Sequence, residues 1–231
     1  MRLGGIQKLT LLDYPGTVAC TVFTIGCNMR CPFCHNSLLV TKTEEAEEYP
    51  VEEFFKFLEK RRGVLDGVCI TGGEPLLHAD AGEFIARIKS MGYKVKLDTN
   101  GTNPQMLRQL LSDGLVDYVA MDIKSSLSTY ERACGIDGIH TDPVKESIDI
   151  LIGGSREYEF RTTCVRELLS DEIIKEIGIL LKGASRYFLQ GYVESEYVPD
   201  KTLHPVEKET LLRYRQELMS SIKTVELRGI D

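Results

Sequence analysis

The feature that most limits the fold is a regular alternation of short β-rich runs with helical patterns. Strand-like runs rich in Val, Ile, Thr and aromatic residues are expected at residues 17–25, 67–71, 94–99, 116–123, 157–164 and 187–193. Between them, apolar residues recur with helical spacing at residues 51–62, 81–91, 104–112, 143–151 and 171–181. Such alternation predicts an α/β fold with parallel strands joined by right-handed crossovers.

The number of strand–helix units decides between two α/β architectures. A last helix is expected at residues 206–220, before an edge strand at residues 224–228. With about six or seven units, the chain is short for a closed eight-stranded barrel. We therefore expect an open partial barrel of the (β/α)6 type, with a doubly wound sheet as the alternative. Pro15-Gly16 lies between two β-like runs and predicts a small N-terminal hairpin.

Composition limits the classes of function. At 231 residues, with 42% hydrophobic and 27% charged side chains, the chain is expected to form one domain spanning residues 1–231. A formal net charge of −7 argues against nucleic-acid binding, which relies on clustered Lys and Arg. No apolar run approaches about eighteen residues and no signal peptide is evident, so we expect a cytoplasmic protein without membrane contact.

Cysteine usage points to metal or redox chemistry. Seven cysteines, an odd number, are poorly explained by a disulfide framework. The stretch "GCNMRCPFCHN" places Cys27, Cys31 and Cys34 in a C-x3-C-x2-C pattern. A structural zinc site normally closes with four ligands, so zinc would need His35 or a distant thiol. A 4Fe–4S cluster normally takes four thiolates, so three would leave one iron open to a small molecule.

Unusual polar or glycine-rich sequence follows four consecutive predicted strands. The cysteine loop comes after the first strand, "TGGEP" follows the second, and "DTNG" and "MDIK" end the third and fourth. In α/β folds, catalytic groups collect at the carboxyl ends of the strands. One shared site is therefore expected at this rim.

Gly72-Gly73 lies where the second predicted strand stops. Because glycine has no Cβ, a ligand's amino group could approach backbone carbonyls there, and Glu74 could add a negative charge. The alternative interpretation is an ordinary turn after a strand.

Three charged residues at the rim suit a ligand with both an amine and a carboxylate. Lys124 is a natural counter-charge for a carboxylate, and Asp98 and Asp122 are natural acceptors for an amine or for ribose hydroxyls. The alternative is that Asp122 and Lys124, two residues apart on a strand, form a local structural ion pair.

The remaining cysteines and histidines have structural interpretations. Cysteines within β-like runs behave as small apolar residues, which applies to Cys20, Cys69 and Cys164. Cys134, in "ERACGIDG", is expected in an exposed, oxidisable loop. Three histidines are expected at helix starts or in loops, in contact with solvent: His78, His140 and His204.

The motifs together resemble a known family. "GCNMRCPFCHN" followed by "TGGEP" is similar to the radical S-adenosylmethionine (SAM) superfamily, and "LDTNG" with "MDIK" narrows the resemblance to glycyl-radical enzyme activases. The segments "KLTLLDYPG" and "TVFTIGCNMRCPFCHN" look most like the activating proteins of anaerobic ribonucleoside-triphosphate reductases. The resemblance is strong over about residues 5–124, and "ELRG" near the end is a weaker match.

The resemblance implies roles for individual residues. Cys27, Cys31 and Cys34 would hold a 4Fe–4S cluster whose open iron chelates the amine and carboxylate of SAM. The matching cofactor-binding positions are Phe33 and His35 along the adenine, Gly73 at the methionyl amine, Asp98 near that amine and a candidate monovalent-cation site, Asp122 and Lys124 at the ribose and carboxylate, and Gln190 as a further adenine contact. Gly72, Glu74 and Asn100 are further expected cofactor-binding residues.

The resemblance also implies a reaction and its partners. One electron from the reduced cluster would split SAM into methionine and a 5′-deoxyadenosyl radical, which takes hydrogen from a glycine of a partner enzyme. The implied partners are an anaerobic ribonucleotide reductase, bound transiently, and a flavodoxin- or ferredoxin-like electron donor. The alternatives are an activase of a pyruvate formate-lyase type enzyme, a radical SAM enzyme acting on a small molecule, and a non-catalytic iron–sulfur or zinc protein.

The cysteine pattern gives a first testable prediction. Anaerobic reconstitution should yield about four irons per chain and no zinc, measured by metal analysis. Replacing Cys27, Cys31 or Cys34 by Ala should abolish the cluster, whereas Cys69→Ala should keep it. Stoichiometric zinc in protein purified without oxygen would contradict the iron interpretation.

Overall fold

The computed structural model describes residues 1–230, and the chain divides into two compact units. Unit 1 comprises Met1–Asn28, Leu38–Thr99 and Asn103–Ala120, and unit 2 comprises Met29–Ser37, Asn100–Thr102 and the chain from Met121 onward. The cysteine loop is shared, because Cys27 belongs to unit 1 while Cys31 and Cys34 belong to unit 2. A single domain over residues 1–231 stays a prediction.

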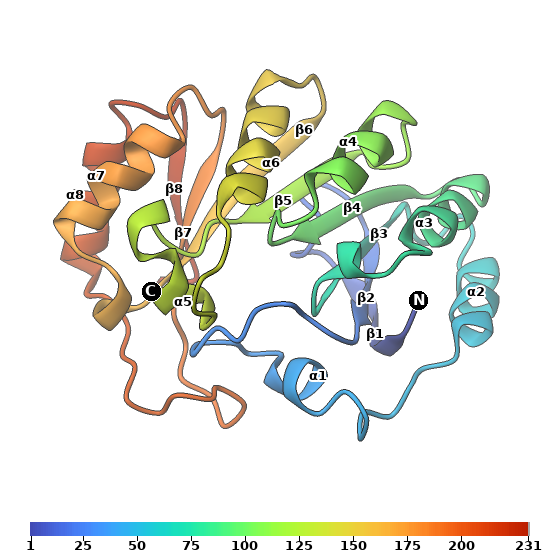
Figure 1. Cartoon of the computed structure of the whole chain (residues 1–231). Coiled ribbons are helices and arrows are strands. Elements are labelled where there is room, and N and C mark those ends of the chain that lie inside the picture. The colour runs from blue at the N-terminus through green and yellow to red at the C-terminus, as the bar shows by residue number, and fades with distance from the viewer. Residues whose placement is uncertain (231) are drawn as a thin grey trace. The chain divides into compact units, whose positions relative to one another are not determined.

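The strands follow one another in the sheet in chain order (Figure 1). Their bounds are β1 Leu3–Thr10, β2 Ala19–Thr24, β3 Gly67–Gly72, β4 Lys94–Thr99, β5 Tyr118–Asp122, β6 Glu157–Cys164, β7 Tyr187–Gly191 and β8 Val225–Arg228. Because β1 and β8 end this order, the sheet does not close, and the expected open α/β fold is confirmed. A doubly wound sheet would reverse its strand order at a switch point, and the strands of residues 1–230 show no reversal.

The helices lie between the strands as the periodicity predicts. They are α1 Ser37–Thr41, α2 Val51–Lys60, α3 Ala81–Ser90, α4 Pro104–Ser112, α5 Tyr130–Cys134, α6 Asp142–Gly153, α7 Asp171–Leu180 and α8 Lys208–Leu218, with 3-10 turns η1 Pro75–Leu77, η2 Leu127–Thr129 and η3 Arg166–Leu168. The sequence missed α1 and α5, because elements of 5 residues are too short for a helical period to show. Within the described chain, none of these helices has the length and apolar character needed to cross a bilayer.

Two helices begin where the sequence supplies a cap. The Asn103 side chain accepts a hydrogen bond from the Met106 N–H at 3.1 Å, directly before Pro104 at the start of α4. Ser170 accepts from the Ile173 N–H at 3.3 Å at the start of α7. Such side chains satisfy N–H groups that have no partner in the first helical turn, and they fix where each helix starts.

Unit 1 contains the predicted hairpin and a parallel sheet. Strand β1 pairs antiparallel with β2, and Pro15-Gly16 lies in their connection, with Gly16 at a φ of 66°. This confirms the N-terminal hairpin. Strands β2, β3 and β4 pair in parallel, and Cys69 on β3 lies opposite Lys96 on β4.

Helices α2 and α3 share an aromatic cluster. Phe54 stacks on Phe84 with ring centroids 5.5 Å apart, and Phe55 meets Phe84 edge-on at 5.3 Å. All three rings are buried. Aromatic burial of this kind contributes much of the stability of a helix–sheet layer.

In unit 2, β6, β7 and β8 pair in parallel. Glu159 on β6 is fully buried and receives hydrogen bonds from Arg228 on β8 at 2.9 and 3.1 Å. The Arg228 guanidinium also lies 3.7 Å from the ring centroid of Phe188 on β7. One side chain thus connects all three strands near the end of the described chain.

The aromatic cluster generates a stability prediction. Phe54→Ala should lower the free energy of unfolding by about 3–5 kcal/mol, because it removes a fully buried ring and leaves a cavity. Phe57→Ala, on the half-buried side of the same helix, is the control and should cost clearly less. Urea unfolding followed by circular dichroism measures both, and equal losses would contradict the assignment of the core face.

Candidate active site

In unit 1, the start of the cysteine loop packs against the glycine turn that follows β3. The Gly73 N–H donates to the Thr24 carbonyl at 2.8 Å, and the Glu74 N–H donates to the Gly26 carbonyl at 2.8 Å. A Cβ on Gly73 would lie 1.9 Å from the Gly26 oxygen, and one on Gly72 would lie 2.4 Å from the Thr24 nitrogen. Both glycines are therefore required by close backbone approach, whatever ligand the turn also meets.

Glu74 fixes the conformation of this turn. Its side chain is buried, and Oε1 accepts from the Leu76 N–H at 3.1 Å and from the Thr99 hydroxyl at 2.7 Å. The carboxylate thus caps η1 and connects it to the end of β4. Its contribution to binding a ligand stays a prediction.

His78 also supports the cysteine loop, which corrects the expectation of a solvated side chain. Its Nε2 lies 3.0 Å from the Ile25 carbonyl oxygen, and the ring is half-buried. Burial lowers the pKa of His78, and the nearby N-terminal amino group lowers it further. A neutral imidazole can donate through Nε2 to this carbonyl.

In unit 2, the segment that follows β7 supports the rest of the cysteine loop. The Asp200 N–H donates to the Pro32 carbonyl at 3.1 Å, and the Ser37 hydroxyl donates to the Tyr197 carbonyl. Nothing in the sequence indicated these contacts, because they are made by main-chain atoms of residues 192–200, which every residue type carries.

The predicted adenine-side residues lie on the same part of the loop. His35 Nε2 is 2.7 Å from the Val193 carbonyl oxygen, and its ring centroid lies 6.0 Å from that of Tyr192. Phe33 is buried, with 5% of its surface exposed. These contacts hold both rings in place, and their role toward adenine stays a prediction.

Helix α5 holds the loop through its C-terminal end. The Arg30 N–H donates to the Cys134 carbonyl at 2.7 Å, and a Cβ on Gly135 would lie 2.1 Å from the Arg30 oxygen. Cys134 itself is fully buried. The expectation of an exposed, oxidisable Cys134 in a loop is therefore wrong, because the residue ends the short helix α5, which was not recognised, and its side chain is buried.

The three cysteines of the loop fit a metal-binding role. All seven cysteines of the chain are free thiols, and Cys31 is buried while Cys27 and Cys34 are partly exposed. Burial raises the pKa of the Cys34 thiol, although the Asn36 N–H and the Lys124 charge act in the opposite direction. Metal binding must therefore displace its proton. Across residues 1–230, no three His, Cys, Asp or Glu side chains are placed to hold a single metal ion.

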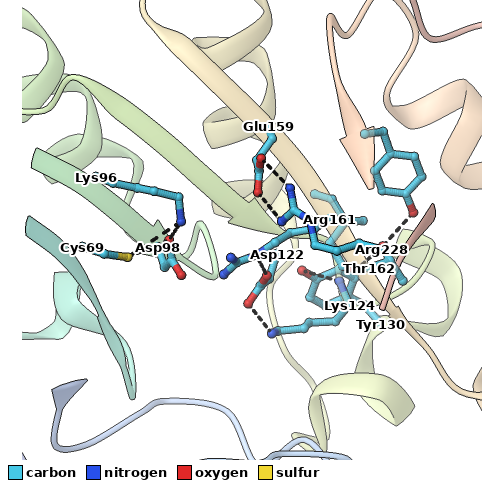
Figure 2. Close-up of polar contacts among 12 residues, drawn as sticks. Cys69, Lys96, Asp98, Asp122, Lys124, Tyr130, Glu159, Arg161, Thr162 and Arg228 are labelled. Atoms are coloured by element: carbon cyan, nitrogen blue, oxygen red, sulfur yellow. Dashed lines mark hydrogen bonds and ion pairs between the residues drawn. The ribbon is translucent and has the colours of Figure 1, made fainter. Parts of the chain in front are cut away.

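At the end of β5, unit 2 carries a compact charge network (Figure 2). Asp122 accepts from Lys124 Nζ at 3.0 Å through Oδ2 and from Arg161 Nε at 2.6 Å through Oδ1. The ion pair proposed as the structural alternative is thus present, and it includes Arg161 on β6, which no motif indicated. The side chains of Lys124 and Arg161 are mostly buried.

This network fixes the charge state of its members. Burial alone would raise the pKa of Asp122, but Arg161 and Lys124 outweigh it and hold that pKa below its usual range. For Lys124, burial is opposed by Asp122 and by Cys31, and the net effect raises its pKa. Both groups therefore stay charged at neutral pH, and Lys124 carries positive charge close to a cysteine of the loop.

Unit 1 carries a second buried ion pair at the end of β4. Lys96 Nζ donates to Asp98 Oδ1, and the Cys69 thiol lies 3.8 Å from the same oxygen (Figure 2). Asp98 was predicted from its motif, whereas Lys96 lies outside the motif and was not predicted.

Two predicted residues lie at the ends of their strands without a charge network. Asn100 is buried, and its Oδ1 accepts from the Thr102 N–H at 3.0 Å and from the Thr102 hydroxyl at 2.7 Å. Gln190 is half-buried on β7, opposite Arg228 in register. Their roles toward a cofactor stay predictions.

Comparison with known proteins gives the family. A family model described as the radical SAM superfamily matches residues 21–158. A Methanocaldococcus jannaschii protein provisionally named as a glycyl-radical enzyme activating enzyme is 35% identical over 216 residues, covering 91% of this chain and 88% of that protein. The pyruvate formate-lyase-activating enzyme of Listeria monocytogenes is 31% identical over 157 residues, covering 60% of this chain and 62% of that enzyme.

One solved structure shows the shared fold. A crystal structure of a domain of pyruvate-formate lyase-activating enzyme from Bacteroides vulgatus superposes with a TM-score of 0.56 at 18% identity, covering 69% of this chain and 98% of that chain. The chain belongs to the radical SAM superfamily. Within it, the chain is similar to glycyl-radical enzyme activating enzymes.

As an enzyme of this class, the chain uses a 4Fe–4S cluster with three cysteine ligands and S-adenosylmethionine. The residues present fit that pair of cofactors, since three free thiols lie on one loop. Backbone hydrogen bonds at Gly26, Arg30 and Pro32 fix this loop along its length. Lys124 adds a permanent positive charge near Cys31 that suits a carboxylate ligand.

Lys124 generates a binding prediction. Lys124→Ala should retain the iron–sulfur chromophore but weaken SAM binding, because a charge-assisted contact to the carboxylate contributes about 1.5–3 kcal/mol. The exposed Lys145→Ala is the control and should leave the affinity unchanged. Equilibrium titration measures both, and an unchanged affinity for Lys124→Ala would mean that Lys124 serves only to pair with Asp122.

Proposed function

We propose that this chain generates the glycyl radical of an anaerobic ribonucleotide reductase. The observation that carries the activase part is the 35% identity over 91% of the chain to a protein provisionally named as a glycyl-radical enzyme activating enzyme. The choice of reductase is supported by the resemblance of the segment "KLTLLDYPG" to the activating proteins of anaerobic reductases; in the structure this segment forms the end of β1 and part of the connection to β2.

We assign the residues of the chain the following roles. Cys27, Cys31 and Cys34 hold the cluster, which when reduced supplies the electron that splits SAM into methionine and a 5′-deoxyadenosyl radical. Lys124 binds the SAM carboxylate, and Asp122 binds a ribose hydroxyl while Arg161 and Lys124 keep it ionised. The remaining assignments are Gly72, Gly73, Glu74, Asp98 and Asn100 around the methionyl amine, and Phe33, His35 and Gln190 around the adenine.

The radical must reach a glycine of the partner. Hydrogen abstraction requires reacting atoms within roughly 3–3.5 Å, so a glycine-bearing loop of the reductase has to enter the site. Ordering a flexible segment weakens binding relative to contact area, which suits a transient complex in which one activase serves many reductases. The electron donor in this proposal is a flavodoxin- or ferredoxin-like protein of the cytoplasm.

A second candidate is an activase for a formate-lyase type enzyme. It is favoured by the 31% identity to the Listeria monocytogenes pyruvate formate-lyase-activating enzyme. That match covers 60% of the chain, less than the 91% covered by the match to the Methanocaldococcus jannaschii protein. Neither relative's name mentions a reductase, so our first choice of the reductase rests on the resemblance of the N-terminal segments alone.

The partner can be identified by its radical. Incubating the reduced protein and SAM with each candidate enzyme should give the doublet of a glycyl radical in electron paramagnetic resonance with the reductase, and Cys31→Ala should give none. A doublet on the formate-lyase type enzyme alone would replace our first choice by the second. SAM consumption without any protein radical would favour a small-molecule substrate instead.

A further inference from the structure

A lysine, an aspartate and a cysteine lie together on one face of the sheet in unit 1 (Figure 2). Cys69 on β3 and Lys96 on β4 are cross-strand partners, and Asp98 follows Lys96 by two residues on the same strand. Alternation along a strand therefore places Lys96 and Asp98 on the same face. Lys96 Nζ donates to Asp98 Oδ1, and the Cys69 sulfur lies 3.8 Å from both atoms.

Lys96 is buried to an unusual degree. Its side chain is 2% exposed, and that of Asp98 is 12% exposed. Lysine is almost never fully buried without a partner, and an isolated buried carboxylate is strongly destabilised. Each residue can therefore be buried in its charged form only because the other is present, and removing one leaves an unpaired buried charge.

Of the two residues, Asp98 lies closer to the carboxyl end of β4, where the predicted site lies, and Lys96 lies deeper in the strand. Asp98 is one residue from the end of the strand, whereas Lys96 lies two residues further inside, in agreement with its lower exposure. A carboxylate accepts hydrogen bonds through two oxygens, so an ammonium on Oδ1 is compatible with a second cationic donor. The ammonium thus supports the carboxylate from inside the strand.

We propose that Lys96 is a positioning residue that provides a built-in cation: its ammonium holds the Asp98 carboxylate oriented to receive the amino group of SAM, so that no bound alkali-metal ion is needed there. The proposal rests on the proposed function, because it takes Asp98 as a contact of the methionyl amine. The competing explanation is that the pair only fills the interior of unit 1.

Two substitutions of Lys96 separate these explanations. Lys96→Ala removes the charge and leaves space for a small cation, whereas Lys96→Met removes the charge but fills most of the volume. SAM affinity would be measured by anaerobic equilibrium titration of the cluster-loaded protein, in sodium, potassium, ammonium, propylammonium or tetramethylammonium chloride at one ionic strength. Lys89→Met is the matched control, because it breaks another ion pair of unit 1, with Asp117 at 2.7 Å.

We expect wild type and Lys89→Met to bind SAM equally in all five salts. Both Lys96 variants should bind roughly ten- to a hundredfold more weakly in tetramethylammonium, the range of one charge-assisted hydrogen bond. Ammonium or propylammonium should restore much of the affinity of Lys96→Ala but not of Lys96→Met. Restoration by a free cation is a result that a purely space-filling role of Lys96 does not produce.

Several outcomes would overturn the proposal. Lys96→Met with the affinity of wild type would leave Lys96 a structural residue, and a wild-type requirement for sodium or potassium would show that the lysine does not replace a free cation. Wild type that binds no SAM at all would defeat the proposed function as well. The two failures are distinguishable: if only the Lys96 proposal is wrong, wild type binds SAM and the Lys96 variants bind it with the same affinity.

A double substitution keeps the proposal testable if Lys96→Met does not fold. Lys96→Met combined with Asp98→Asn removes both charges, a change that buried pairs often tolerate. If Lys96 acts through Asp98, the double variant should bind SAM as Asp98→Asn alone does. An additional loss of more than about threefold in the double variant would mean that Lys96 acts independently of Asp98, and the proposal would fail.

Discussion

The close approach of two backbone segments in unit 1 is the constraint on which the site depends. Gly73 lies so near Gly26 that any side chain would overlap the carbonyl oxygen, at 1.9 Å from a Cβ. Two hydrogen bonds then join the glycine turn to the end of β2 and to the residue before Cys27. The position of the first cysteine relative to the turn is therefore set by main-chain contacts.

Much of the fold follows from the sequence because its signals are periodic. The alternation of β-rich and helical runs gave the open sheet, and Pro15-Gly16 gave the hairpin. Short elements were not predicted, because α5 has 5 residues and is too short for a helical period to show. Since α5 was missed, Cys134 at its end was wrongly expected to be exposed. A tertiary contact, not local propensity, also placed His78 against the cysteine loop.

The candidate site was predicted less completely than the fold, for a physical reason. Motif residues such as Asp98 and Asp122 stand out at strand ends, but their charge partners Lys96 and Arg161 lie inside strands. Strand β4 reads KVKLDT and β6 reads EYEFRTTC, so charged residues alternate along both strands as they do where one face meets solvent, and nothing in the pattern marks Lys96 or Arg161 as buried. In each unit, an acidic residue found by its motif is paired with a basic one that the motif does not include.

The support of the cysteine loop by residues 192–200 has a further consequence. Pro32, Ser37 and His35 are held through main-chain atoms of Asp200, Tyr197 and Val193. The side chains of Val193 and Tyr197 are themselves largely exposed, at 61% and 49%. The contacts made by Val193 and Tyr197 therefore do not depend on the identity of these two side chains, whereas Tyr192 and Val198 of the same segment are buried. A single nick in the chain there would do more harm to the loop than substitution of either exposed side chain.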